Sequence, residues 1–163
     1  MNVEPGSETM AGLDAARRYA TAPAHDAYVQ APLMVECWAT LHDARERNVL
    51  AACEPRESST HWELYSDMGS GAFCAHFSWH EPFEVRSQTC VTDGRRHHLA
   101  MRFDGAEATL YVDGAEAARQ ALKRVGDMPR QSGELTAGIE TALVPSYDCA
   151  GVITQLKLSK SPT

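Results

Sequence analysis

The chain has 163 residues, of which 44% are hydrophobic and 23% charged, and acidic residues exceed basic ones by 22 to 15. This composition is typical of a single globular domain and excludes intrinsic disorder. The net charge of −7 is opposite to that of a nucleic-acid-binding surface, and no apolar run approaches the ~20 residues of a membrane span, so we expect neither nucleic-acid binding nor membrane insertion.

The first residues, 1–12, are polar and predict a flexible N-terminal tail. They lack the charged and then apolar pattern of a signal peptide, so we expect either a cytoplasmic protein or a piece of a longer one. Helix propensity is high over residues 13–22, but Pro23 follows directly. A helix and an irregular or extended segment therefore both stay open for this stretch.

From Tyr28 onward, short apolar stretches alternate with turn residues, which is the pattern of β-strands. The alternation is clear in residues 61–65, where Trp62 and Leu64 fall on one face of the predicted strand. Further strands are predicted over residues 35–41, 48–53, 73–79, 83–91, 134–139 and 152–158.

Two Asp-Gly pairs give the strongest local signal. Residues 97–103 alternate, Asp104-Gly105 follows, residues 108–112 alternate again, and Asp113-Gly114 comes next. Asp-Gly supplies the positive φ values that tight hairpin turns need, so three antiparallel strands are predicted in a meander. Residues 116–125 favour a helix by propensity, but the turn signal predicts a strand to about position 120 and irregular chain after it.

Ten to twelve short strands with few helices predict an all-β fold, an antiparallel two-sheet β-sandwich or jelly roll around one core. The domain is expected over residues 13–159, followed by a short C-terminal tail, 160–163. Trp38 and Phe103 are expected in the core.

The five cysteines are Cys37, Cys53, Cys74, Cys90 and Cys149, and no two of them form a Cys-x-x-Cys motif. Since five is odd, at least one is unpaired if all pairing is internal. We expect mainly free thiols used as small buried apolar side chains. One disulfide, joining Cys149 to Cys90 or Cys53, is the alternative.

Four segments, taken together, resemble the laminin-G-like family. They read LMVECW at 33–38, DGRRHHLAMRFDG at 93–105, ATLYVDG at 108–114 and GVITQLKLS at 151–159. Arg96 stands where the family usually has Trp, and Thr154 and Gln155 replace its usual acidic pair. The block from His61 to Phe73 resembles the bacterial, planctomycete-type branch of this superfamily.

The resemblance covers nearly the whole chain and implies the concanavalin A-like lectin/glucanase sandwich. It implies function much less well, because this fold hosts lectins, protein-binding modules and glycosidases. Glycosidases on this sandwich carry a Glu-x-Asp-x-x-Glu strand, which the sequence lacks. It also has no nucleophile elbow, phosphate-binding loop or His-Glu-x-x-His motif, so we predict that the chain is not an enzyme.

The candidate ligand-binding residues are His61, Glu63, Tyr65, His76 and Trp79. The first four fall on the face opposite the apolar positions of their strands, and Trp79 is expected at an exposed rim. They combine aromatic rings with polar groups, as a sugar site requires. The alternative is a solvated sheet face with ordinary cross-strand pairs. We predict a non-catalytic glycan-recognition module, with a protein-interaction or self-associating module as the alternative.

Laminin-G-like modules often bind Ca²⁺ at the rim of the sandwich through oxygen ligands, so the resemblance implies calcium as a cofactor. Asp67 and Asp148 lie in predicted turns and are the candidate metal ligands, unless each simply caps its turn. The family works mostly outside the cytoplasm. The resemblance therefore also implies an extracellular or cell-surface location, as part of a larger protein.

Overall fold

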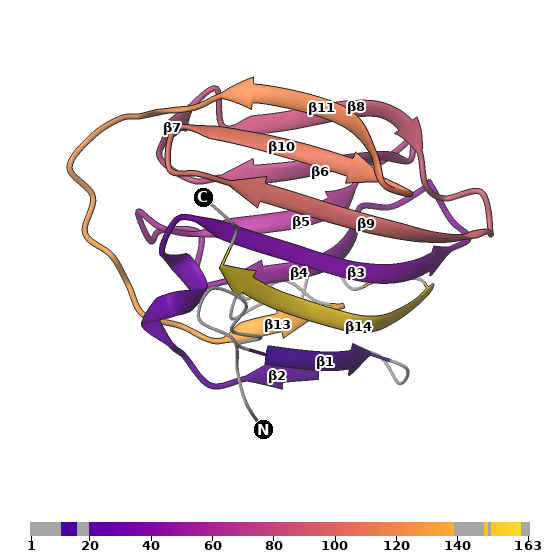
Figure 1. Ribbon diagram of the computed structural model, residues 1–163, viewed down its shortest axis with the longest axis horizontal. Helices are drawn as coiled ribbons and strands as arrows, with labels where there is room; N and C mark the ends of the chain where they lie inside the picture. The colour runs from indigo at the N-terminus through magenta and orange to yellow at the C-terminus, as the bar shows by residue number, and fades with distance from the viewer. Residues whose placement is uncertain (1–10, 16–19, 139–148, 150, 161–163) are drawn as a thin grey trace.

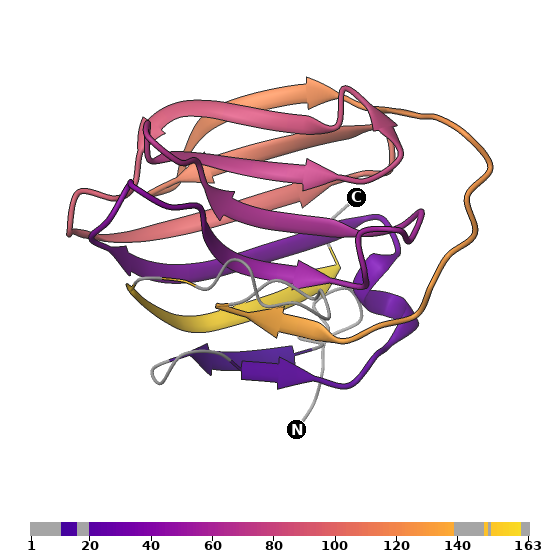
Figure 2. The same cartoon turned by 180° about the vertical axis from the view of Figure 1, so that it is seen from behind.

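The computed structural model describes residues 11–15, 20–138, 149 and 151–160. Its strands form two six-stranded antiparallel sheets that lie face to face (Figures 1 and 2). The predicted all-β sandwich is therefore confirmed. The described residues form fourteen strands rather than ten to twelve, because four of the strands have only two or three residues.

The sheet at the front of Figure 1, here sheet A, has the spatial order β1 (Ala11–Ala15), β14 (Gly151–Lys160), β3 (Leu33–Leu41), β9 (Arg96–Phe103), β10 (Glu107–Val112) and β11 (Ala115–Ala121). Sheet B, at the front of Figure 2, has the order β2 (Ala20–Ala22), β13 (Leu135–Ala137), β4 (Asn48–Cys53), β5 (Trp62–Ser66), β6 (Ala72–Phe77) and β8 (Glu84–Cys90). A two-stranded ribbon, β7 (His80–Glu81) with β12 (Lys123–Arg124), and a 3-10 turn, η1 (Asp26–Val29), lie at one end of the sandwich.

The segment for which helix and extended chain were both open forms strands at its two described ends. β1 pairs with β14, and β2 pairs with β13. Ala11 and Gly12, which the sequence placed in the flexible tail, pair with Leu158 and Lys157. Lys160, predicted in the C-terminal tail, belongs to β14 and pairs with Leu33. Residues 1–10 and 161–163, where the rest of the predicted tails falls, lie outside the described residues.

The core lies between the sheets and follows the alternation of the strands. In β3, Val35, Cys37 and Ala39 point inward and are buried. The prediction that Trp38 belongs to the core is wrong: it occupies the opposite phase, half-buried on the outer face of sheet A. Its ring lies 4.3 Å from the Arg96 guanidinium, so a cation replaces the apolar surroundings expected for it. Phe103 is half-buried and packs against the core.

The predicted meander of β9, β10 and β11 is confirmed. Asp113 and Gly114 form the two-residue turn, with φ of 51° and 82°. The Asp113 carboxylate also binds His97 Nδ1 at 2.7 Å, and Asp93 binds His97 Nε2 at 2.9 Å. Partial burial opposes protonation of His97, but these two hydrogen bonds outweigh it and raise the pKa of His97. The His97 ring therefore ties the turn to the start of β9.

All five cysteines are free thiols, so neither disulfide alternative forms. Cys37, Cys53 and Cys74 are buried, Cys90 is exposed and Cys149 is intermediate. Burial raises the pKa of Cys37 and of Cys53 to about 12, which keeps these thiols protonated and unreactive. The expectation of small buried apolar side chains is confirmed for three of the five.

The turn between β5 and β6 supplies a matched pair of glycines for testing the packing of sheet B. Gly69 and Gly71 both have positive φ, 91° and 67°. A Cβ at Gly71 would lie 2.1 Å from Thr92 Oγ1, whereas a Cβ at Gly69 has no neighbour within 4 Å. We expect Gly69→Ala to cost about 1 kcal/mol through its φ alone. Gly71→Ala should cost about 1–3 kcal/mol more because of the clash.

Urea unfolding of the two alanine variants and the wild type measures both losses. Equal losses for Gly69→Ala and Gly71→Ala would contradict the close approach of Gly71 to Thr92.

Candidate functional site

The outer face of sheet B brings together four of the five predicted ligand residues. Trp62 and Leu64 of β5 point into the core, so Glu63 and Tyr65 point outward. Glu63 pairs with His76 across β5 and β6. The rings of His61 and His76 lie 5.8 Å apart.

This face is covered rather than open to solvent. His61, Glu63 and Tyr65 are each exposed by 2% or less. Arg47 forms an ion pair with Glu63, and its guanidinium carbon lies 3.6 Å from the centre of the Tyr65 ring. Arg56 Nη2 lies 3.4 Å from both Glu63 oxygens. A ligand that touched these three predicted residues would first have to displace the arginines.

The Glu63 carboxylate holds the two arginines that cover this face, which together with it form what is here called the covered layer. Its burial alone raises its pKa, but His61, Arg47 and Arg56 outweigh that effect and bring the pKa of Glu63 to about 2. His61 donates its Nδ1 proton to the Glu54 carbonyl at 2.7 Å and places Nε2 3.6 Å from Glu63. Glu63 is therefore ionised at neutral pH, and the positive charges of Arg47 and Arg56 balance its negative charge.

His76 lies at the border between this covered layer and the surface. Burial and the nearby His61 and Arg56 lower the pKa of His76 to about 4, so it is neutral at pH 7. Its Nε2 lies 3.3 Å from the Ser78 hydroxyl, and its ring centre lies 5.6 Å from that of Phe83. His76 therefore presents a neutral ring with hydrogen-bonding capacity.

Beside His76 the surface forms an open groove of about 350 Å³, here called the Trp79 groove. Its lining residues are Arg56, Glu57, His76, Ser78, Trp79 and Phe83. Trp79 is 38% exposed and Phe83 is 59% exposed. Among the described residues only two other large apolar side chains, Met68 and Val152, are exposed. Half of the exposed large apolar side chains thus gather in one groove, which marks it as a contact surface.

Trp79 is held in place from three sides. Its φ of 58° is in the left-handed region, which a bulky residue adopts only when its surroundings impose it. Its indole Nε1 donates to the Glu57 carbonyl at 3.2 Å, and its own carbonyl accepts from Val125 N at 2.9 Å. A Cβ on Gly126 would lie 3.6 Å from the ring, so that segment packs against it. The indole is a fixed, partly exposed platform.

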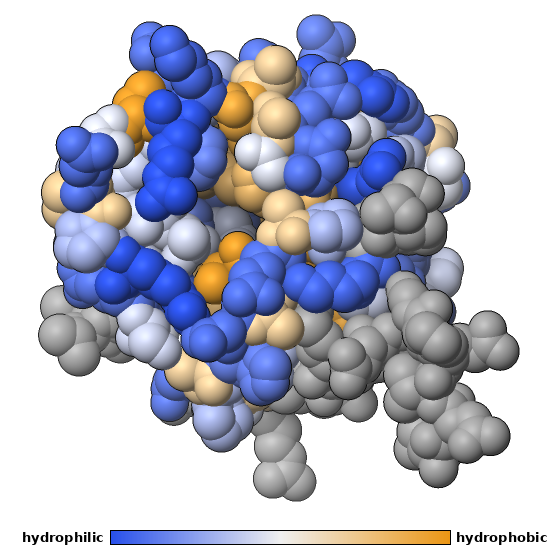
Figure 3. All heavy atoms as spheres, turned by 60° about the vertical axis from the view of Figure 1, so that its left-hand side comes forward, coloured by the Kyte–Doolittle hydropathy of each residue, from blue (hydrophilic) through white to orange (hydrophobic). Residues whose placement is uncertain are grey.

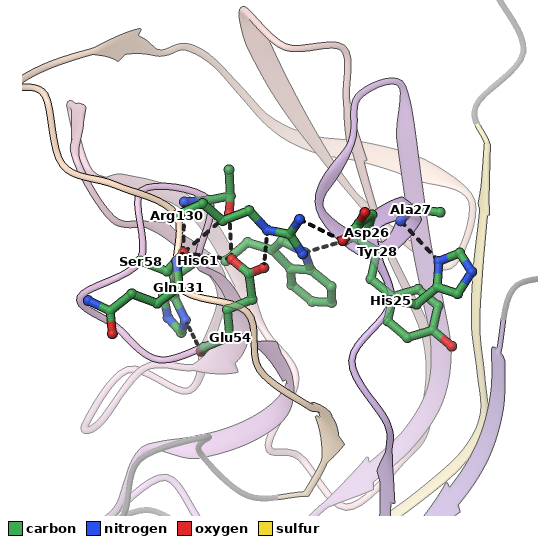
Figure 4. Close-up of polar contacts among 11 residues, drawn as sticks. His25, Asp26, Ala27, Tyr28, Glu54, Ser58, His61, Arg130 and Gln131 are labelled. Carbon is green, nitrogen blue, oxygen red and sulfur yellow. Dashed lines mark hydrogen bonds and ion pairs between the residues drawn. The ribbon is translucent and has the colours of Figure 1, made fainter.

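The segment that supports Trp79 is itself held by a buried carboxylate. Residues 125–134 form the long connection along the end of the sandwich (Figure 1). Arg130 of this connection donates from Nε to Glu54 Oε1 at 2.6 Å and pairs with Asp26 of η1 at 2.7 Å (Figure 4). Ser58 Oγ donates to Glu54 Oε2 at 2.7 Å. Glu54 thus connects the end of β4, the following loop that carries Ser58, and the long connection.

The predicted calcium ligands do not come together among the described residues. Asp67 pairs with Arg86 at 2.6 Å and accepts from Ser70 Oγ at 2.8 Å. Arg86 and Ser70 act on Asp67 in opposition to its slight burial and lower its pKa. Asp148 lies outside the described residues. Within the described ranges no group of three or more His, Cys, Asp or Glu side chains could hold a metal ion, and the calcium site stays a prediction.

Sequence reasoning did not select Arg56, Glu57, Ser78 or Phe83 for the groove. Phe83 follows Pro82 at the start of the edge strand β8, a position where an exposed aromatic ring has no core to fill. An aromatic residue directly after a proline at the start of a strand could therefore have been selected from the sequence as a candidate for the groove. Arg56 and Glu57 sit in the loop after β4, and only the folded chain brings them near Trp79.

Removing the Glu63 charge tests the covered layer. Glu63→Gln leaves two guanidinium groups over the sheet without their shared carboxylate, and we expect a loss of about 3 kcal/mol of unfolding free energy at pH 7. Glu57→Gln, an exposed neighbour, is the control and should change stability by less than about 0.5 kcal/mol.

The contribution of Glu63 to the free energy of unfolding should decrease as the pH falls. Because the folded pKa of Glu63, about 2, lies below its ordinary value of 4.5, its contribution is present above pH 4.5 and is lost as the pH falls towards 2. The stability gap between wild type and Glu63→Gln, measured by denaturant unfolding, should therefore shrink over that range. A gap that stays constant from pH 7 to pH 2.5 would contradict the ionised buried carboxylate.

Many solved structures are similar to this chain, among them the following three. The sialidase module CBM40 of Ruminococcus gnavus, bound to α2,3-sialyllactose, has a TM-score of 0.64 and 12% identity, covering 80% of this chain and 76% of that one. Domains LG4-5 of the mouse laminin α1 chain have a TM-score of 0.65 and 14% identity, with coverage of 95% and 45%. The SAP-like pentraxin of Limulus polyphemus has a TM-score of 0.58 and 12% identity, with coverage of 97% and 75%. Identities this low show a shared fold.

No curated protein matches the chain. The planctomycete-type branch therefore stays a prediction. The described residues include no helix long and apolar enough to cross a membrane. A family model of the laminin G type matches residues 14–162, nearly the whole chain. The chain thus belongs to the concanavalin A-like lectin/glucanases superfamily.

Proposed function

We propose that this chain is a non-catalytic recognition module that binds a carbohydrate in the Trp79 groove. The observation that supports it best is the fixed, 38% exposed indole of Trp79, with polar side chains around it. A platform that is already ordered loses little conformational entropy when a ligand binds.

The groove offers the two kinds of contact that a sugar uses. The aromatic rings of Trp79 and Phe83 fit the C–H face of a pyranose, while Arg56, Glu57 and Ser78 supply donors and acceptors for hydroxyl groups. Arg56 also favours a sugar that carries a carboxylate. The similarity to a carbohydrate-binding module solved with sialyllactose agrees with this assignment.

The absence of catalysis in this proposal rests on the carboxylates. Glycoside hydrolysis on a sandwich of this kind uses two carboxyl groups about 5–5.5 Å or 6.5–9.5 Å apart. Among the described residues, Glu57 is the one carboxylate that lines the Trp79 groove. Glu63, an acid on the covered face, has a lowered pKa and pairs with two arginines, so it is a poor proton donor.

The proposal also includes where the protein acts and whether binding requires calcium. The family resemblance supports an extracellular or cell-surface setting as part of a larger protein. A calcium ion at Asp67 would have to compete with Arg86 for the carboxylate. We therefore expect EDTA to leave binding in the Trp79 groove unchanged.

Substitution of Trp79 tests the site. Trp79→Ala removes the platform and should weaken binding of α2,3-sialyllactose at least tenfold, since buried aromatic anchors contribute about 2 kcal/mol or more. Lactose should bind more weakly than sialyllactose, because it lacks the carboxylate. Trp79→Ala should weaken the binding of lactose as well. Isothermal titration calorimetry, with and without EDTA, measures both sugars.

Met68→Ala is the matched control, because Met68 is 65% exposed in the turn at the other end of β5. It should bind like the wild type. Unchanged sugar binding by Trp79→Ala, or no binding of either sugar to the wild type, would contradict the proposal. Capture of a protein ligand that depends on Trp79 would support the protein-interaction alternative instead.

A further inference from the structure

A second pocket opens at the end of the sandwich, between the two sheets, and its volume is about 190 Å³. Figure 3 shows this end of the molecule, where a hollow with apolar residues is surrounded by polar ones. The walls come from both sheets, the 3-10 turn and the β7–β12 ribbon. They include Val29, Leu33, Trp62, Phe77, His80, Phe103 and Arg124.

One wall of this pocket is apolar and largely aromatic, while Ser59, Thr60 and His61 line another part of it. The ring of His80 lies 6.0 Å from that of Phe77 and 6.1 Å from that of Phe103, edge-on to both. Leu33 and Trp62 are almost fully buried beneath them. A planar aromatic ring would match this aromatic wall.

The pocket has one positively charged side chain, Arg124, on the exposed ribbon strand β12. Seven other arginines of the described residues form ion pairs with carboxylates. Arg124 forms none within the part of the chain that the structure describes, although the chain as a whole is acidic. His80 donates its Nδ1 proton to the Ser78 carbonyl at 2.9 Å.

We infer that this pocket is a binding site for a small aromatic carboxylate with a single ring. The size agrees, because an apolar cavity of about 150 Å³ accommodates benzene and this one, at about 190 Å³, leaves room for a short acidic substituent. The ring packs against Phe77 and Phe103, and the carboxylate pairs with Arg124. The inference is independent of the sugar proposed for the Trp79 groove.

The test uses phenylacetate and its neutral isostere phenylacetamide as probes, with dissociation constants measured by NMR titration of the full chain. Phenylacetate should bind at least about tenfold more tightly than phenylacetamide, as expected for a charge-assisted hydrogen bond. Arg124→Gln should remove that preference. Lys123→Gln, the adjacent exposed residue of the same strand, should retain it.

Two further variants locate the ligand. Ala31→Leu, at the exposed rim of the pocket, should weaken both probes at least about tenfold by filling the entrance. Phe83→Ala, in the Trp79 groove, should leave both dissociation constants unchanged. Equal affinity for the two probes, no binding of either, or a loss caused by Phe83→Ala would overturn the inference. None of these results bears on sugar binding.

Discussion

The buried charge of Glu63 is the constraint around which sheet B is built. A carboxylate with no exposed surface persists only where cations and hydrogen bonds replace its water. Here the chain on either side of one strand supplies the two cations, because Arg47 directly precedes β4 and Arg56 follows it closely. Both side chains turn over the neighbouring strand β5 and meet at Glu63. The consequence is a sheet whose outer face is covered by its own arginines.

That cover determines where recognition takes place. A module of this fold with an open sheet face could bind a ligand along the strands, but here the aromatic ring of Tyr65 lies beneath Arg47. Among the described residues, the large aromatic side chains that stay exposed, Trp79 and Phe83, lie at the border of this covered face, in the groove that Arg56 also lines. Arg56 therefore serves both regions: it neutralises Glu63 on one side and lines the Trp79 groove on the other.

The groove is rigid because a second buried carboxylate holds the chain behind it. Glu54 accepts from Arg130, and the connection that carries Arg130 also provides the backbone bond from Val125 and the packing of Gly126 against Trp79. The strained backbone of Trp79 is maintained by these contacts rather than by its own preference. The same connection follows the ribbon strand that bears Arg124, so both pockets depend on one ordered end of the sandwich.

The sequence predicted what depends on alternation and on local turns. The two faces of β5, the meander with its Asp-Gly turns and the antiparallel sandwich all follow from a period of two and from residues that accept positive φ. The prediction of the site missed that His61, Glu63 and Tyr65 are buried. Arginines in loops cover them, and loop positions have no periodicity from which their placement could be predicted. Trp38 shows a related limit: hydrophobicity alone does not distinguish a core ring from one that lies under a guanidinium on the surface.

The three tryptophans allow one spectrum to test the central claim that the Trp79 groove is the recognition site. Their indole N–H groups occupy the three relevant places: Trp79 in the groove, Trp62 in the core with its proton donated to the Tyr28 carbonyl at 2.9 Å, and Trp38 on the outer face of sheet A. A ¹H–¹⁵N correlation spectrum recorded during titration with α2,3-sialyllactose should shift the Trp79 signal and leave the other two in place. A shift of the Trp38 signal with Trp79 unmoved, or no shift at all, would contradict the account.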